Sequence, residues 1–324
     1  MIVDTDLRPD VFAAVMATGI ISISADDHHY IVISCILTAV AIAALIVLIG
    51  LVVLKLIVRR TFAFHHLDEP DTVLRLFTFV AAWGVLAARF EPHRLPFWVL
   101  GAVAVLAWLT LSPIALRSTA TRNVGELRGG ARGAWLLASV ATSGVAIVLA
   151  DAARFTGFRA LYWLAVAVWA LAVIVYGLIT WLMVGAAVAD RSVTDRSEPD
   201  IWILMGGLAI ASLAGNHVYR ALDASSPLRD GVKIATLASW VVASLWIPLL
   251  VYLSMRRVNT RAGSLRFAGV WWAMVFPLGM YSTSSEATSI DARLPALSTI
   301  SLVFFWIALA VWVVVALAAV RGWH

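Results

Sequence analysis

The chain has 324 residues, of which 62% are hydrophobic and 13% are charged, and its mean hydropathy is +0.93. This composition excludes a soluble globular domain, because apolar runs of about 18 or more residues are long enough to cross a membrane as helices. The formal charge of +5 would suit a nucleic-acid ligand in a soluble protein. In a membrane protein the charge follows from topology, so we expect the lipid bilayer and not nucleic acid as a partner.

Ten apolar segments follow one another along the chain, and short segments rich in small residues alternate with longer, more apolar ones. In chain order they are Val11–Ala25, Ile31–Leu54, Leu76–Ala88, Leu95–Leu116, Ala134–Ala150, Ala160–Ala189, Ile201–Gly215, Ile234–Met255, Phe267–Ser285 and Leu294–Val320. Each short segment and the long one after it form a module, and the modules repeat along the chain. We expect one transmembrane domain, residues 1–324, with modules at about 9–58, 71–116, 132–189, 199–257 and 266–320.

The lengths of the segments predict two layers of helices. The short segments, at about 1.5 Å per residue, cover roughly 20 to 28 Å, which is less than the hydrocarbon core of about 30 Å. The long segments cross that core with residues to spare. The sequence therefore predicts an all-α integral membrane fold of ten helices, arranged as five helical hairpins around a central pore. The short odd-numbered helices lie inside, and the long even-numbered helices face lipid.

The short segments are rich in glycine, alanine, serine and threonine, which favours a pore wall. For each residue alone, close packing of helices is the alternative explanation. Pro277 lies in the middle of the ninth segment, where it removes a backbone hydrogen bond and should bend the helix. The residues predicted to line or bend the pore on these grounds are Thr18, Gly19, Gly84, Gly144, Gly206, Gly207, Pro277 and Gly279.

The basic residues predict the orientation of the chain. The termini and the even-numbered connections hold most of the 24 lysines and arginines, which places both termini in the cytoplasm of a multi-pass protein of the cell membrane. Four arginines, Arg8, Arg75, Arg132 and Arg266, stand at the starts of short segments. Rings of basic residues favour anions in pores, so these four predict a basic cytoplasmic mouth. The alternative is that they only set topology, and both explanations can hold.

Residue patterns of enzymes and metal sites are missing from the sequence. It holds no H-E-x-x-H pattern and no glycine-rich phosphate loop after a strand, and its one cysteine, Cys35, excludes a cysteine-based metal cluster. The stretch Gly125–Gly133 is interpreted as a flexible loop, and the pairs His28/His29 and His65/His66 as solvated loop residues. We therefore expect no enzymatic activity, no cofactor and no metal.

Ionisable residues are scarce within the short segments. Asp151, His217 and Glu286 lie at the outer ends of the fifth, seventh and ninth segments. Because ionisable groups inside a bundle mark proton relays, their position at the ends favours passive conduction over proton coupling. One of the three could still reach inward.

Phe276 is the residue predicted to act as the gate of the pore. It immediately precedes Pro277 and is surrounded by small residues. A bulky ring at this point could close a narrow path and open it by rotating, since hydrophobic constrictions gate by dewetting. The alternative is ordinary packing in the bundle core.

The segment Pro9–Ile21 resembles the first-helix motif of the tellurite-resistance/dicarboxylate-transporter family, which includes the plant slow-type anion channels. Trp271–Tyr281 is similar to its ninth-helix motif, and Asp71–Phe79 resembles the start of its third helix. The resemblance implies five hairpins around a pore and a homotrimer with one pore per subunit. It also implies that Phe276 is the gating phenylalanine, that Gly19 lines the pore, and that Phe77 or Phe79 adds a second aromatic ring, without deciding which.

Two functions fit these observations. The first is a passive anion channel or permease of the cytoplasmic membrane, which conducts small inorganic anions past Phe276. The second is a secondary transporter of C4-dicarboxylates such as malate, with or without proton coupling, linked to tellurite resistance. In the second case only, Asp151, His217 or Glu286 should control transport. A membrane enzyme, the third class, is disfavoured by the missing motifs.

Overall fold

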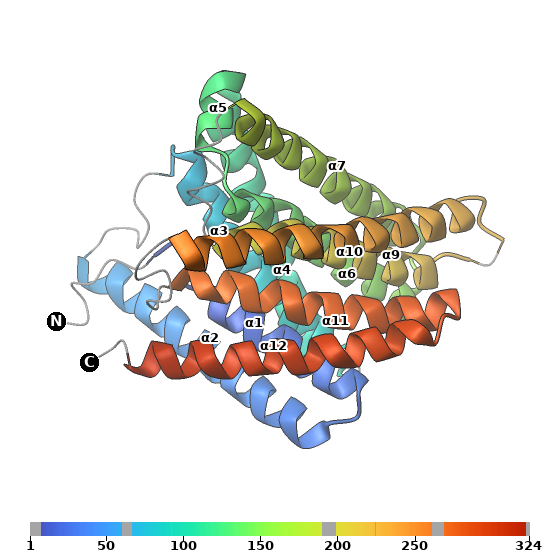
Figure 1. Ribbon diagram of the computed structural model, residues 1–324. Helices are drawn as coiled ribbons and strands as arrows, with labels where there is room; N and C mark the ends of the chain where they lie inside the picture. The colour runs from blue at the N-terminus through green and yellow to red at the C-terminus, as the bar shows by residue number, and fades with distance from the viewer. Residues whose placement is uncertain are drawn as a thin grey trace.

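The computed structural model of the chain describes residues 8–59, 67–91, 93–189, 199–223, 225–260 and 269–321. Every regular element within these ranges is a helix. Most of the long helices run roughly along one direction, and both ends of the chain lie at the same end of the bundle (Figure 1). We call this end of the bundle the termini end and the opposite end the far end.

Five helices enclose the middle of the molecule. They are α1 (Ala13–Asp27), α3 (Pro70–Arg89), α6 (Leu137–Thr156), α9 (Ile203–Ala221) and α11 (Trp272–Ala292). Each contacts the next, and α11 returns to contact α1, so these inner helices form a closed cycle. Their residues are mostly buried, and in α6 every residue of the most apolar stretch is buried. The inner helices therefore surround a common interior.

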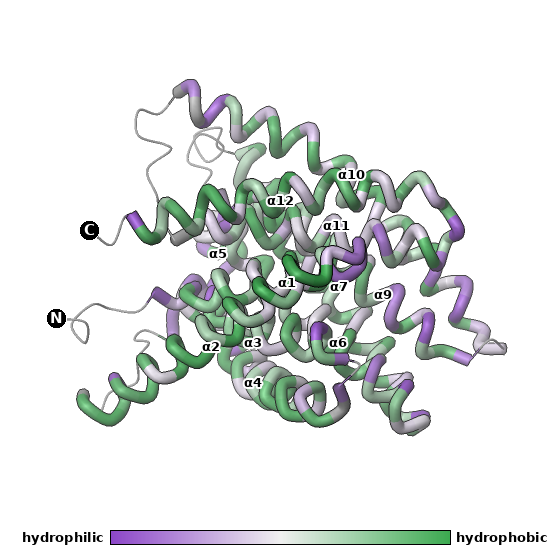
Figure 2. The backbone as a smooth tube through the Cα atoms, turned by 90° about the horizontal axis from the view of Figure 1, so that it is seen from below, coloured by the Kyte–Doolittle hydropathy of each residue, from purple (hydrophilic) through white to green (hydrophobic). Residues whose placement is uncertain are grey.

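Five longer helices cover the inner ones. They are α2 (Ile31–Arg59), α4 (Arg94–Ala120), α7 (Arg159–Ala189), α10 (Arg229–Thr260) and α12 (Ala296–Arg321). Each packs mainly on the inner helix that precedes it in the chain. Only 17 to 22% of their most apolar stretches is buried within the protein, and Figure 2 shows these outer helices as largely hydrophobic. Such exposed apolar surface is stable only in contact with lipid or another apolar surface.

The inner helices have 15 to 21 residues and the outer helices 26 to 32. The inner helices are shorter than the outer ones, as predicted, but most of them extend beyond the predicted apolar segments. For example, α6 continues past Ala150 to Thr156 through Asp151 and Arg154. Asp151 pairs with His217 of α9, and Arg154 pairs with Glu91, two residues after the end of α3.

The prediction of a flexible loop at Gly125–Gly133 is wrong. The helix α5 (Val124–Gly130) occupies most of this stretch, and the side chain of Asn123 caps it by accepting a hydrogen bond of 2.9 Å from the Glu126 amide. The short helix η2 (Gly133–Leu136) leads into α6, as η3 (Pro199–Trp202) leads into α9 and η4 (Gly269–Trp271) into α11.

Eight of the described helices are long and apolar enough to cross a membrane. They are all five outer helices and α3, α6 and α9, the last two together with η2 and η3. Of the ten predicted crossings, α1 is too short at 15 residues, and the second half of α11 is rich in serine, threonine and acidic residues. The described chain is thus a helical membrane protein.

Candidate functional site

Contacts with neighbouring helices define which side of α11 faces the interior. Pro277 packs on α9, since a Cβ atom placed on Gly206 would lie 2.8 Å from Pro277 Cγ. A Cβ atom placed on Gly279 would lie 3.0 Å from Ile20 Cγ2, so this side packs on α1. Tyr281 turns to the outer layer, where its ring stacks on an aromatic residue of α10. The side of α11 between the α1 and α9 contacts therefore faces the interior.

Phe276 lies on this interior side. At about 100° per residue, Phe276, Met280 and Thr283 fall in one narrow sector of the helix, between the directions of Pro277 and Gly279. The Phe276 side chain is fully buried. The Thr283 hydroxyl is also buried and has no hydrogen-bond partner among the described residues, so it remains available to water or a solute.

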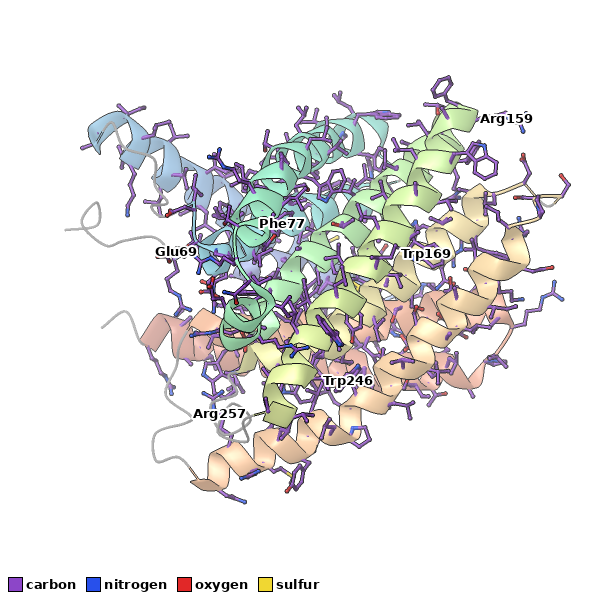
Figure 3. The ribbon with its side chains drawn as sticks, turned by 90° about the horizontal axis from the view of Figure 1, so that it is seen from above. Glu69, Phe77, Arg159, Trp169, Trp246 and Arg257 are labelled. Carbon is purple, nitrogen blue, oxygen red and sulfur yellow. The ribbon has the colours of Figure 1, made fainter. Side chains whose placement is uncertain are left out.

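The structure places the two candidate aromatic residues of α3 on different sides. Gly84 and Val85 of this helix contact α6 and α1, respectively, and Phe77 lies on the side between those contacts, 2% exposed. Figure 3 shows Phe77 in the body of the molecule. Phe79 instead contacts Phe12 and Trp83 at ring distances of 5.0 and 5.9 Å. With them it lines an apolar pocket of about 430 Å³ beneath α2 and α4.

Gly144 is the predicted lining glycine that borders open space. A Cβ atom placed on it would meet no atom within 4 Å, although the residue is buried. A Cβ atom on Gly84 would lie 3.8 Å from the Gly144 backbone, so both glycines lie where α3 and α6 meet beside the interior.

Other predicted lining residues contact neighbouring helices. Cβ atoms placed on Gly19, Gly206, Gly207 and Gly279 would each come within about 3 Å of a side chain of the adjacent helix. Thr18 accepts a hydrogen bond of 2.9 Å from the Trp312 indole of α12, so its hydroxyl is turned to the outer layer. For these five residues the structure favours helix packing, the alternative that sequence reasoning left open.

At the termini end, two of the four predicted mouth arginines are neutralised by carboxylates. Arg75 donates to Asp71 at 2.9 Å and to Asp10 at 3.2 Å, and only 9% of its side chain is exposed. Arg8 also pairs with Asp10, at 3.2 Å. The Trp135 indole donates to Asp71 at 3.1 Å. This network joins the starts of α1, α3 and α6, and it reduces the positive charge that Arg8 and Arg75 present to an anion.

Of the remaining two predicted mouth arginines, the structure describes only one. Arg132 is exposed at the start of η2, whereas Arg266 lies outside the described residues. In the fourth module, where the sequence has an acidic residue instead, Asp200 accepts a hydrogen bond of 2.9 Å from the Ala134 amide. A Cβ atom on Gly133 would collide with the Asp200 carbonyl, so only glycine fits this approach of η2 to η3.

At the far end, the structure brings predicted ionisable residues together. Asp151 of α6 is completely buried, and its Oδ1 lies 2.8 Å from His217 Nδ1 of α9. Arg154 approaches the same oxygen at 3.5 Å. The other oxygen, Oδ2, is buried and has no hydrogen-bond partner in the described part of the chain. Asp151 therefore points into the bundle, which is the alternative that the sequence left open for these three residues.

Asp27 completes this group and was missed by the sequence interpretation. It ends α1 on the side of the helix that carries Ile20 and Ile23, seven and four residues earlier. It interacts electrostatically with Glu286 of α11 and with His217. The seven-residue spacing between Ile20 and Asp27 could have indicated that both lie on one side of the helix. The sequence at the end of an apolar segment does not show which other helix that side faces. Asp27, Asp151, His217 and Glu286 form the far-end cluster.

His28, interpreted as a solvated loop residue, is instead half-buried. Its Nε2 lies 2.8 Å from the Ser301 hydroxyl of α12. Burial lowers the pKa of His28, although Glu286 acts in the opposite direction. The imidazole is therefore neutral at neutral pH and adds no positive charge beside the far-end cluster.

Comparison with known proteins identifies the family of the chain. Residues 6–320 match the voltage-dependent anion channel family. The chain belongs to this family. This membership agrees with the family resemblance predicted from the sequence and with the apolar helices of the described chain.

Individual relatives agree with a membrane transport protein. The chain is 25% identical, over 338 aligned residues, to an uncharacterized transporter of Methanocaldococcus jannaschii; the alignment covers 94% of this chain and 90% of that protein. Uncharacterized membrane proteins from two strains of Mycobacterium tuberculosis are 34% identical over 118 residues. That match covers 36% of this chain and 60% of the length of each mycobacterial protein.

Proposed function

We propose that the protein is a passive anion channel or permease of the cytoplasmic membrane, closed by the ring of Phe276. The observation that supports it most is the position of this side chain: it is fully buried on the side of α11 between the α1 and α9 contacts. Phe77 faces the same interior from α3. In the proposed pathway these rings form a hydrophobic constriction that excludes water and ions until Phe276 rotates.

The proposed pathway runs between the five inner helices. All five inner and all five outer helices cross the membrane, as five hairpins of a single domain. Both termini lie in the cytoplasm, so the far end faces outward, and three copies form a homotrimer with one pathway each. Gly144 and Gly84 line the pathway where it is open. Arg132, with Arg266, supplies positive charge at the cytoplasmic mouth, aided by the positive dipole ends of the inner helices.

Substitution of Phe276 tests the gate. In liposomes containing the purified protein, we expect Phe276→Ala to raise passive chloride and nitrate flux about tenfold or more, because the closing ring is lost. Phe97→Ala is the matched control: Phe97 is equally buried but lies between α4 and α6, away from the interior. Unchanged or lower flux in intact, folded Phe276→Ala protein would contradict the gate.

A second function is supported by the far-end contact of Asp151 with His217. The alternative is a proton-coupled transporter of dicarboxylates such as malate, with a connection to tellurite resistance. Carboxylate–histidine pairs inside a bundle are suited to carrying protons. In the same liposomes, malate uptake accompanied by acidification of the lumen would favour this alternative, whereas chloride flux without proton movement would favour the channel.

A further inference from the structure

The far end of the inner helices carries more carboxylates than arginines. Arg89 pairs with Asp26 at 3.4 Å, and Arg220 pairs with Asp291 at 3.0 Å. Arg154 is shared between two carboxylates, Glu91 at 3.3 Å and Asp151 at 3.5 Å. No described arginine forms an ion pair with Asp27 or Glu286, and Arg220, which acts electrostatically on Asp27, is paired with Asp291. These three arginines therefore face six carboxylates, which leaves an excess of negative charge around the interior.

Two carboxylate oxygens of the far-end cluster are buried without a donor. Asp151 Oδ2 and Glu286 Oε2 have no hydrogen-bond partner among the described residues, and the Asp151 side chain is 0% exposed. Buried polar atoms are nearly always paired, so each of these oxygens offers a position where a proton can add. Asp27, by contrast, is exposed and gives bulk solvent access to the cluster.

Other charged groups at this end do not compensate the cluster. The cations of the outer layer stand at helix starts, and two of them, Arg229 and Lys233, lie over the ring of Tyr219. His28 is bonded to Ser301. The remaining basic residues whose side chains are described, in and between the helices at this end, are exposed: His29, His93, Arg159 and Arg293.

We propose that the far-end cluster is a proton-binding site that controls admission of anions, an inference that rests on the proposed anion pathway. When Asp27, Asp151 and Glu286 are ionised, their charge repels an anion at the mouth of the interior. Protons that enter past Asp27 neutralise these carboxylates and charge His217, which changes the potential from repulsive to attractive. Acid therefore opens the far end to anions.

The expected effect is large enough to measure. One unit charge about 10 Å from a permeating anion, at an effective dielectric constant of about 20, changes its occupancy roughly tenfold. Nitrate flux through wild-type protein should thus rise by about this factor between about pH 8 and about pH 4.5, a range that covers histidine and reaches carboxylates. Nitrate itself stays charged throughout, so protonation of the solute cannot produce the rise.

Carboxamide variants test the site with the same pH on both sides of the liposome, which removes the effect of protein orientation. Asp27→Asn and Glu286→Gln should each raise nitrate flux at the upper pH and flatten its pH dependence, and the double variant should do so more strongly. The Asp27 side chain makes no hydrogen bond in the described structure, so this variant should fold. Asp230→Asn, an exposed position at the start of α10, is the matched control and should keep the wild-type response.

The outcomes separate this site from the gate. If Phe276→Ala conducts nitrate but wild-type flux does not rise in acid, the proton site is wrong and the gate stands. Variants that keep the full wild-type pH response would also overturn the site. If Phe276→Ala conducts no anion at any pH, the proposed function itself fails.

Discussion

At the scale of single residues, the glycines of the inner helices show why composition alone cannot assign a role. Gly144 borders open space, whereas the place of a side chain on Gly206 is occupied by Pro277. The sequence presents both as small residues in short segments. Only the neighbour, far away in the chain, decides whether glycine lines a path or permits close packing. Thr18 is a similar case, because Trp312, near the end of the chain, takes its hydroxyl.

The close contact at Gly206 predicts a loss of stability on enlargement. The new methyl group of Gly206→Ala would lie 2.8 Å from Pro277 Cγ, so α9 and α11 must separate, at a cost of about 1–3 kcal/mol. Thermal unfolding in detergent should show a lower melting temperature. Gly177→Ala in α7, where nothing lies within 4 Å, is the control and should melt at or above the wild-type temperature. Equal melting of both variants would contradict this packing.

At the scale of helices, hydrophobic alternation predicted the two layers because lipid exposure requires long apolar stretches. It could not predict where the inner helices end. Asp151 and His217 both follow the ends of predicted apolar segments. The helices α6 and α9 nevertheless continue through them, and the two side chains meet between these helices. Pairing between residues far apart in the chain depends on the angle and register of two helices, which hydropathy does not contain.

The network at the termini end predicts different costs for two arginines that share Asp10. Arg75→Gln leaves Asp10 and Asp71 near each other without their cation, and because the Arg75 side chain is only 9% exposed, the loss should be about 1–3 kcal/mol. Arg8→Gln removes a pair whose arginine is 53% exposed, worth about 0–1 kcal/mol. Melting temperatures in detergent measure the difference. A larger loss for Arg8→Gln would show that Arg75 does not hold α1 and α3 together.

At the scale of the whole molecule, the closed cycle of α1, α3, α6, α9 and α11 follows from a repeat that the sequence already contains. Each module adds one inner helix with the same orientation and one outer helix that returns the chain. Five such steps bring α11 back to α1. The repeat does not specify the number of modules that closes the cycle, nor which side of each inner helix faces its centre. Those depend on contacts such as that of Gly279 with Ile20, which join the two ends of the chain.

If the chain crosses the membrane ten times and both termini are cytoplasmic, two exposed positions should lie on opposite sides of the membrane. Arg122 lies between α4 and α5 near the termini end, and Asp223 follows α9 at the far end. Single cysteines at these sites, in a Cys35→Ser background that removes the native thiol, can be treated with a membrane-impermeant maleimide. In intact cells we expect Asp223→Cys to be labelled and Arg122→Cys to be labelled only after lysis. The reverse pattern would invert the orientation. Labelling of both or neither in intact cells would mean that one of α6, α7 and α9, the three long helices between the two positions, does not cross the membrane.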